Sequence, residues 1–250
     1  MTVATHHFVT PDSQQLAWHE LGEGRPVVLL HGLFSDAETN WIRFGHAEAI
    51  AARGFRVIMP DLRGHGESAR PHEASAYPPD ILARDGLALI AHLGLEDYDL
   101  GGYSLGGRTA VRMVVNGARP RRLIVSGMGL EGLLGTGARS AHFKAILHGL
   151  GTHKRGSPEW LAEAFLKTTG GDPQALLPLL DSFVDTSERE LRAIAMPTLV
   201  LSGAEDHDNG SAEALAELLP DATWVEVPGN HMSAVTKPDL GRAITDFLSR

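Results

Sequence analysis

The sequence predicts an α/β protein built on a doubly wound, mostly parallel β-sheet. Three observations lead to this prediction. Short runs rich in Val, Ile and Leu alternate with longer segments of helical periodicity along most of the chain. Most of these runs are apolar throughout, as expected of parallel strands that helices cover on both faces. The length of 250 residues fits a single α/β domain, and no internal repeat indicates a solenoid.

Six parallel strands are expected from the apolar runs, and one edge of the sheet is expected to differ. The predicted strands lie at residues 27–30, 55–59, 98–100, 123–125, 198–201 and 223–227. Residues 6–21 instead contain a Pro11-Asp12-Ser13 turn between two short extended segments. We therefore expect an antiparallel hairpin at the edge of the sheet.

The segments between the strands carry start and stop signals of helices. Pro79 and Asp80 open a segment in which Leu and Ile recur at helical spacing, and Gly94 closes it. Ser211 can cap a further helix that Pro220 ends. The other helices of the sheet layers are expected at 105–116 and from residue 238 onward.

One long segment interrupts the alternation of strands and helices. From about Gly129 to Glu190 there is no convincing strand, only turns and helical pieces at 141–150, 158–167 and 173–183. An all-helical insertion between two strands indicates a cap over the carboxyl edge of the sheet. We therefore expect a core domain formed by residues 1–128 and 191–250, with residues 129–190 as a helical cap or lid.

The net charge argues against nucleic acid and anionic lipid surfaces as partners. The chain has 22 Lys and Arg against 31 Asp and Glu, a net charge of -9, and this sign repels phosphate groups. No apolar run approaches the roughly 20 residues that span a bilayer. The start of the chain lacks the basic and apolar parts of a secretory signal. We expect a cytoplasmic protein that acts on a small molecule, and its oligomeric state is not indicated.

The composition also excludes several kinds of site. The chain contains no cysteine, so disulfides, thiolate catalysis and Cys-ligated zinc are excluded. The adjacent pairs His6-His7 and His207-Asp208 lack further ligands nearby in the sequence, so accidental adjacency is the better interpretation. We expect neither a metal nor an organic cofactor.

A nucleophile motif directly follows the predicted strand at 98–100. Residues 102–107 have the sequence GYSLGG, a G-x-S-x-G pattern between a strand and a helix. In this context Ser104 lies on a sharp turn, and the flanking glycines remove side chains that would clash across it. The N-terminus of the next helix brings N–H groups and a positive dipole close to the hydroxyl. The alternative, a phosphate-binding loop, would need the Lys and Ser or Thr of a P-loop, which are absent.

A serine hydroxyl needs a base that accepts its proton. Among the 13 histidines, His231 is the candidate because it lies between the last predicted strand and the last helix. A loop at that point shares the carboxyl edge of the sheet with Ser104. His207 and His65 are the alternatives, but neither has a separate loop of this kind.

The third member of a triad holds the imidazole tautomer and stabilises its charged form. Asp206 follows the predicted strand at 198–201 and is the favoured acid, with Asp208 and Glu205 as rivals. The order along the chain is then Ser, Asp, His, as expected for a nucleophile on such a turn.

An oxyanion is typically stabilised by two backbone N–H groups. One should come from Leu105, the residue after the nucleophile. The other should come from the loop after the first parallel strand, where Gly32 allows a close approach to the site. In this loop the N–H of Leu33 is favoured over that of Phe34.

These segments together resemble the α/β-hydrolase superfamily along essentially the whole chain. The resemblance rests on His31-Gly32, on residues 61–68 (DLRGHGES), 102–107 (GYSLGG) and 203–206, and on 229–231 (GNH). In that family the block at 61–68 is structural, so Asp61 and His65 are not expected to be catalytic. The helical insertion is a lid in similar proteins. The resemblance therefore implies substrate-lining roles for apolar residues of the lid and the oxyanion loop, namely Phe34, Leu130, Leu133, Phe143 and Phe165.

The nucleophile helps to choose among the activities of this family. Haloalkane dehalogenases and related epoxide hydrolases use Asp at the nucleophile position, so Ser104 argues against both. The resemblance implies a serine carboxylesterase or lactonase that works through an acyl-enzyme. Carbon–carbon bond hydrolases and cofactor-free perhydrolase-like members remain open, although their oxyanion loops usually differ from residues 31–34. A non-catalytic ligand receptor with the same fold also remains open, and turnover of simple esters would distinguish it.

Overall fold

The computed structural model describes residues 2–250, and within them eight strands form one sheet in the order β1-β2-β4-β3-β5-β6-β7-β8. From β3 to β8 every neighbouring pair is parallel, while β1 and β2 form an antiparallel hairpin that joins the sheet through β4. The predicted doubly wound sheet with a hairpin at its edge is thus confirmed. The strands are β1 Ala4–Val9, β2 Gln15–Leu21, β3 Arg25–Leu30, β4 Phe55–Pro60, β5 Asp99–Tyr103, β6 Leu123–Ser126, β7 Thr198–Gly203 and β8 Ala222–Val227.

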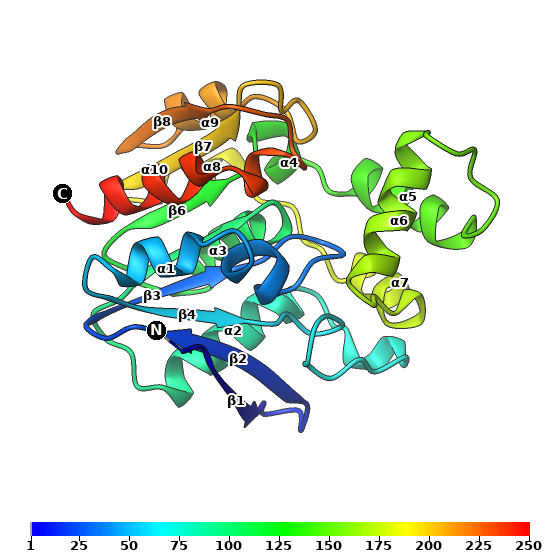
Figure 1. Cartoon of the computed structure of the whole chain (residues 1–250), viewed down its shortest axis with the longest axis horizontal. Helices are drawn as coiled ribbons and strands as arrows, with labels where there is room; N and C mark the ends of the chain where they lie inside the picture. Colours follow the sequence, from blue (N-terminus) through cyan, green and yellow to red (C-terminus); the bar gives the residue numbers. More distant parts are fainter. Residues whose placement is uncertain (1) are drawn as a thin grey trace.

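Helices cover both faces of this sheet (Figure 1). Helices α1 (His46–Ala51) and α10 (Pro238–Leu248) pack on one face, over an apolar layer that includes Trp41 and Ile244. The other face is covered by helices whose apolar residues form a second layer with the opposite side of the strands. These helices are α2 Ile81–His92, α3 Leu105–Val115 and α9 Ala212–Leu218. Burial on both faces explains why strands β3 to β7 lack polar alternation.

The helices between β3 and β4 were not predicted from the sequence. A π-helical turn (η1, Glu38–Ile42) and the short helix α1 occupy this connection, and α1 begins after Gly45, whose φ is 76°. In the six residues of α1 the buried side chains are two alanines, one isoleucine and His46. An apolar stripe this short and small produces only a weak periodic signal in the sequence.

The connection from β6 to β7 contains helices and turns but no strand. It contains α4 Leu130–Leu134, α5 Gly137–His148, α6 Pro158–Thr168, α7 Pro173–Asp181 and α8 Glu188–Leu191. Figure 1 shows α5, α6 and α7 beyond the carboxyl ends of the parallel strands, where the sequence analysis expects a cap. Helix α5 begins four residues before the predicted start at 141, in a segment where Gly137 and polar residues hide the pattern. The short helices α4 and α8 were not predicted, although Ser187 and Glu190 form a capping box at α8.

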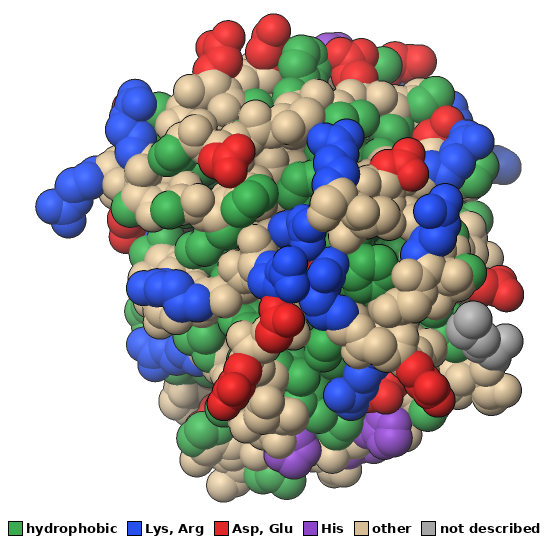
Figure 2. Space-filling view, turned by 90° about the vertical axis from the view of Figure 1, so that its left-hand side faces the viewer, with side chains coloured by type: hydrophobic (Ala, Val, Ile, Leu, Met, Phe, Trp, Pro, Cys, Tyr) green, Lys and Arg blue, Asp and Glu red, His purple; other side chains and the backbone are tan. Residues whose placement is uncertain are grey.

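The opposite end of the sheet is closed by buried charges. Asp99 is fully buried at the start of β5 and pairs with Arg25 at 2.9 Å and Arg122 at 3.8 Å. Arg25 also donates to the carbonyl of Leu248 at 3.0 Å, which ties the end of α10 to the sheet. Figure 2 shows several Lys and Arg side chains near the centre of the face at this end. None of the helices in the described part of the chain combines the length and apolar character that a bilayer span requires.

Candidate active site

The turn between β5 and α3 holds Ser104 in a strained conformation. Ser104 has φ 54° and ψ −114°, a region that residues other than glycine rarely adopt. Its N–H donates to the carbonyl of Ser126 on β6 at 2.8 Å, and its carbonyl accepts from Arg108 N–H at 3.0 Å. These bonds fix the turn, so the surrounding structure sustains the strain.

The glycines of the motif are required by close backbone contacts. A Cβ atom on Gly102 would lie 2.3 Å from the carbonyl carbon of Gly106. A Cβ on Gly106 would lie 2.1 Å from the carbonyl oxygen of Leu30 on β3. The G-x-S-x-G pattern therefore lets α3 start directly against β3 and β5, and this raises Ser104 at the carboxyl edge of the sheet.

Two loops from distant parts of the chain bring His231 and Asp206 to Ser104. His231 Nε2 lies 3.0 Å from Ser104 Oγ, and His231 Nδ1 lies 2.8 Å from Asp206 Oδ2. A carboxylate accepts at Nδ1, so the neutral ring carries its proton there, and Nε2 is free to accept from the serine hydroxyl. The three residues thus form a continuous hydrogen-bonded chain, with the Asp side chain 4% and the His side chain 11% exposed.

Electrostatics keep Asp206 ionised. Burial by itself would raise the pKa of this carboxyl. The hydrogen bond and charge of His231 outweigh burial, and the N–H of Asp208, which donates to Oδ1 at 3.2 Å, assists. The pKa of Asp206 is therefore lower than its ordinary value. An ionised carboxylate here can stabilise an imidazolium on His231.

The position of His231 is fixed by residues that sequence reasoning did not single out. Tyr103 Oη donates to the carbonyl of His231 at 2.6 Å, and the two ring centroids are 5.4 Å apart. Burial raises the pKa of the Tyr103 phenol, so it stays a donor. Asn230 Oδ1 accepts from the N–H groups of Met232 and Ser233 at 3.1 and 2.9 Å. The position of Tyr103 next to the nucleophile is the only signal that the sequence offers for this contact.

The loop after β3 lies directly beside the nucleophile. A Cβ built on Gly32 would be 3.6 Å from Ser104 Cβ. Asn40 Oδ1 accepts the Gly32 N–H at 2.9 Å, and the buried His31 donates from Nδ1 to the Gly32 carbonyl at 2.8 Å. His31 Nε2 accepts the N–H of Leu62 at 2.9 Å, which fixes the neutral tautomer. The loop is therefore anchored to two other segments of the core.

Three backbone amides at this point are free to meet an oxyanion. Within residues 2–250, the N–H groups of Leu33, Phe34 and Leu105 have no protein acceptor. Phe34 has φ 60°, and its carbonyl accepts from Thr169 Oγ1 at 2.6 Å. Both Leu33 and Phe34 remain candidates for the second oxyanion donor, with Leu105 as the first.

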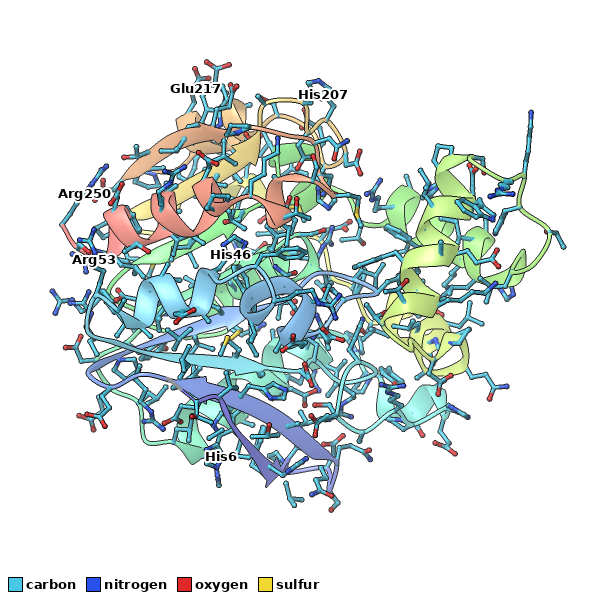
Figure 3. The ribbon with its side chains drawn as sticks, viewed as in Figure 1. His6, His46, Arg53, His207, Glu217 and Arg250 are labelled. Atoms are coloured by element: carbon cyan, nitrogen blue, oxygen red, sulfur yellow. The ribbon has the colours of Figure 1, made fainter. Side chains whose placement is uncertain are left out.

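The rival residues lie in other surroundings. His207 is exposed, and Figure 3 shows it at the edge of the molecule pointing outward. His65 is buried, and burial with the nearby His31 lowers its pKa to about 3. Glu205 is exposed, and the exposed Asp208 pairs with Arg139 of α5 at 3.3 Å.

The block at 61–68 holds the loops of the core together. Asp61 accepts the N–H groups of Ala37 and Glu67 at 2.9 and 2.8 Å, and its Oδ2 is 3.1 Å from His19 Nε2. The neighbouring Arg63 is fully buried, and all five of its N–H donors have acceptors. These acceptors are the carboxylates of Asp12 and Asp85 and the carbonyl of Ala76. In this structure the block forms internal bonds away from Ser104.

The predicted lining residues belong to one apolar cluster that also contains Leu105. Phe34 and Leu133 are buried in it, and Leu130, Phe143 and Phe165 are half-buried against it. The rings of Phe34 and Phe143 meet edge to face with centroids 5.3 Å apart. Phe34 and α5 are thus in direct contact, while a role of the five residues in substrate binding stays a prediction.

Among the described residues, one group of side chains has the spacing of metal ligands. Ligand atoms of Asp206, Asp208 and His231 lie within 4.8 Å of one another. Asp206 and His231 are already hydrogen-bonded to each other at 2.8 Å. Exposed carboxylates near a histidine are common without an ion, so this geometry alone does not indicate a metal centre.

Known proteins resemble this chain along most of its length. A model of the Alpha/beta hydrolase family matches residues 27–240, a range that includes Ser104, Asp206 and His231. The AB hydrolase superfamily protein YisY from Bacillus subtilis is 32% identical over 227 residues, covering 80% of this chain and 81% of that protein. A non-heme haloperoxidase from Rhodococcus erythropolis is 29% identical, covering 97% of this chain and 98% of that protein.

A solved structure also resembles this chain over its whole length. A thermophilic esterase from Thermogutta terrifontis has a TM-score of 0.74 and is 26% identical, with 100% of this chain and 98% of the esterase covered. The likeness therefore extends over the helical connection between β6 and β7 as well as the sheet.

Proposed function

The chain belongs to the Alpha/beta hydrolase family, and we propose that it hydrolyses carboxylic esters or lactones through an acyl-enzyme on Ser104. The observation that carries this proposal is the hydrogen-bonded chain from Ser104 Oγ through His231 to Asp206, with distances of 3.0 and 2.8 Å. A hydroxyl, a base and an orienting acid in this geometry suit acyl transfer. The likeness to an esterase of the same fold supports the choice of substrate class.

In the acylation step, Ser104 Oγ attacks the carbonyl carbon while His231 Nε2 accepts the hydroxyl proton. The imidazolium that forms is stabilised by the ionised Asp206. When the tetrahedral intermediate collapses, the bond to the alcohol oxygen breaks, and His231 returns the proton to that oxygen. The products of this half-reaction are the free alcohol and an ester of Ser104.

In the second half-reaction a water molecule takes the place of the alcohol. His231 accepts a proton from the water as the oxygen attacks the acyl carbon, and Ser104 leaves with that proton. In both half-reactions the negative oxygen would accept from the N–H of Leu105 and from that of Leu33 or Phe34. Unpaired donors that are already in place cost no reorganisation, which is why such groups are effective.

We propose that residues 129–190 act as a cap that selects the substrate. The contact between Phe143 and Phe34 and the bond from Thr169 to the Phe34 carbonyl support this, because both join the helical segment to the oxyanion loop. Arg139 of α5 also pairs with Asp208, two residues after the acid. Apolar side chains of such a cap would cover the acyl or alcohol part and exclude water.

Turnover of p-nitrophenyl acetate and butyrate tests the proposal, with Ser104→Ala as the matched control. We expect release of p-nitrophenol by the wild type and loss of nearly all turnover in the variant. A fluorophosphonate probe should label the wild type at the peptide that contains residues 102–107. Labelling that persists in Ser104→Ala would overturn the assignment of the nucleophile, and a folded wild type that cleaves no ester or lactone would overturn the substrate class.

A further inference from the structure

A buried arginine on the helix after the nucleophile forms no ion pair with the described residues, although the charge of Asp185 acts on it from further away. Arg108 lies one turn after Ser104 in α3 and is 5% exposed. One guanidinium nitrogen, Nη2, donates to the carbonyl of Gly132 in α4. Its Cζ is 5.3 Å from the ring centroid of Phe183, in the segment after α7. The guanidinium therefore lies between both ends of the helical connection and the helix of the nucleophile.

The lack of an ion pair within residues 2–250 distinguishes Arg108 from the other buried arginines. Its Nη1 is buried without any acceptor, and no carboxylate of residues 2–250 forms an ion pair with it. Arg63 meets two carboxylates, and Arg112, one turn further along α3, meets Asp80. A buried charge that lacks a partner is costly, and the nearby N-terminus of α3 adds positive potential.

Arg108 is one of the residues that line a small cavity. Its lining includes Leu105, Arg108, Thr109 and Phe183, and its volume is about 20 Å³. This is room for one or two water molecules, or for one small anionic group whose remainder extends outside. The other charged residues of the lining, Asp80 and Arg112, bind each other at 3.0 Å. Only Arg108, of the charged residues in the lining, is left with a free donor.

We propose that this cavity is a binding site for a carboxylate, held by Arg108. A guanidinium with a free N–H group binds a carboxylate more strongly than it binds a water molecule. The reason is that its hydrogen bond to the carboxylate is charge-assisted. Burial lowers the pKa of Arg108 only to about 10, so the side chain stays charged at neutral pH and attracts an anion. The carboxylate has two possible sources, a free small acid or a carboxylate group on the substrate. The second source rests on the proposed ester hydrolysis.

Titration of the wild type with sodium formate tests the site without any turnover. The control is sodium methanesulfonate at the same ionic strength, because this anion is too bulky for the cavity. We expect saturable shifts of the amide resonances of Leu105, Thr109 and Phe183 with formate only. At a formate concentration about ten times Kd, the unfolding equilibrium constant should fall roughly tenfold.

Two variants locate the effect. Arg108→Met should abolish the formate effect, whereas Arg112→Met should keep it, because Arg112 lines the same cavity but is already paired. If Arg108→Met does not fold, Arg108→Lys serves instead and should weaken the effect, because it keeps the charge but loses the fork.

Kinetics separate the two sources of the carboxylate. The p-nitrophenyl monoester of glutarate is compared with p-nitrophenyl valerate, which has a methyl group in place of the carboxylate. If the substrate supplies the carboxylate, Arg108→Met should lower kcat/KM for the glutarate ester by roughly ten- to a hundredfold relative to the valerate ester. If Arg108→Met lowers kcat/KM equally for both esters and formate still causes saturable shifts in the wild type, the site binds a free acid.

The proposal is overturned if formate causes no saturable shift and the two esters respond equally to Arg108→Met. Shifts at exposed arginines rather than at the cavity would overturn it as well. If the protein cleaves no ester at all, the proposed function fails, and the formate titration still decides the site.

Discussion

Two aspartates lie close to His231, and their surroundings give them different roles. The Asp206 side chain is only 4% exposed and accepts from His231 Nδ1 at 2.8 Å. Asp208 is exposed, and its carboxylate faces Arg139 while its N–H donates to Asp206. The backbone of Asp208 therefore orients the acid, whereas its side chain faces the helical segment.

This difference can be tested by matched substitutions. Asp206→Asn should leave the protein folded and lower kcat by roughly 10²–10⁴, because the imidazole loses tautomer control and charge stabilisation. Asp208→Asn should lower kcat much less. The measurement is kcat for p-nitrophenyl butyrate, with circular dichroism as a check on folding. A larger loss for Asp208→Asn would mean that the acid lies two positions further along.

The surroundings of His19 lead to a second prediction at the scale of single residues. Its Nε2 lies 3.1 Å from Asp61 Oδ2, and its Nδ1 lies 3.0 Å from Thr5 Oγ1. Burial alone would lower the pKa of His19, but the hydrogen bond and charge of Asp61 outweigh it and raise the pKa above 6.5. The folded state then holds the proton more tightly than the unfolded state. The resulting stability is complete below pH 6.5 and is lost as the pH rises through the folded-state pKa.

We therefore expect the wild type to exceed His19→Gln in free energy of unfolding by an amount that shrinks as the pH rises. Urea unfolding at about pH 5.5 and about pH 8.5 measures this difference, since the two values bracket the ordinary histidine pKa. Thr5→Val is a control that keeps the ion pair, so most of the pH dependence should remain. A difference that is the same at both pH values would contradict the assigned pair.

At the scale of elements, α3 starts so close to the backbone of β3 that a side chain at Gly106 would clash. The Cβ of Gly106→Ala would meet the Leu30 carbonyl oxygen at 2.1 Å. We expect a loss of about 3 kcal/mol or more in the free energy of unfolding, because neither backbone can yield without moving β3 or α3.

Gly137→Ala at the start of α5 is the matched control, since its Cβ would meet nothing within 4 Å. It should stabilise the protein slightly, by up to about 1 kcal/mol. Denaturant unfolding of both variants measures the contrast. Equal stability of Gly106→Ala and the wild type would show that the nucleophile turn has more freedom than its contacts suggest.

At the scale of the whole molecule, the helices between β6 and β7 lie where the parallel strands end (Figure 1). If they form the substrate pocket, substitutions there should change selectivity and leave the chemistry intact. We expect Phe143→Ala and Phe165→Ala to change the ratios of kcat/KM among acetate, butyrate and octanoate esters. Each lost contact should change the activation free energy for the affected ester by about 1–3 kcal/mol. Triad substitutions should lower turnover of all three esters together.

Phe44→Ala is the control for this series, because Phe44 is 37% exposed and lies outside the helical segment. It should leave the ratio of the three esters unchanged. Equal changes for all three esters in both Phe143→Ala and Phe165→Ala would show that these residues only fill the core.

Most of the sheet could be predicted because its signals are local. Each parallel strand is a short apolar run, and α2, α9 and α10 begin at their predicted proline or serine signals. The connection from β3 to β4 gave no such signal, because α1 is one and a half turns long and buries small residues. The helical segment was expected as a whole, while the limits of α5 were misjudged where glycine and polar residues mask the period.

The sequence by itself determined the fold class and favoured Ser104, Asp206 and His231 as the candidate triad, because each follows a strand at the carboxyl edge of a parallel sheet. Only the tertiary structure shows that, of the three candidate carboxylates, Asp206 is hydrogen-bonded to His231, since this 2.8 Å bond joins residues 25 positions apart. It alone revealed the Tyr103 bond to the His231 carbonyl and the unpaired Arg108. Strand and turn patterns act through neighbours in the chain. Hydrogen bonds and counter-charges depend on which distant segments meet, and packing of the whole chain determines that.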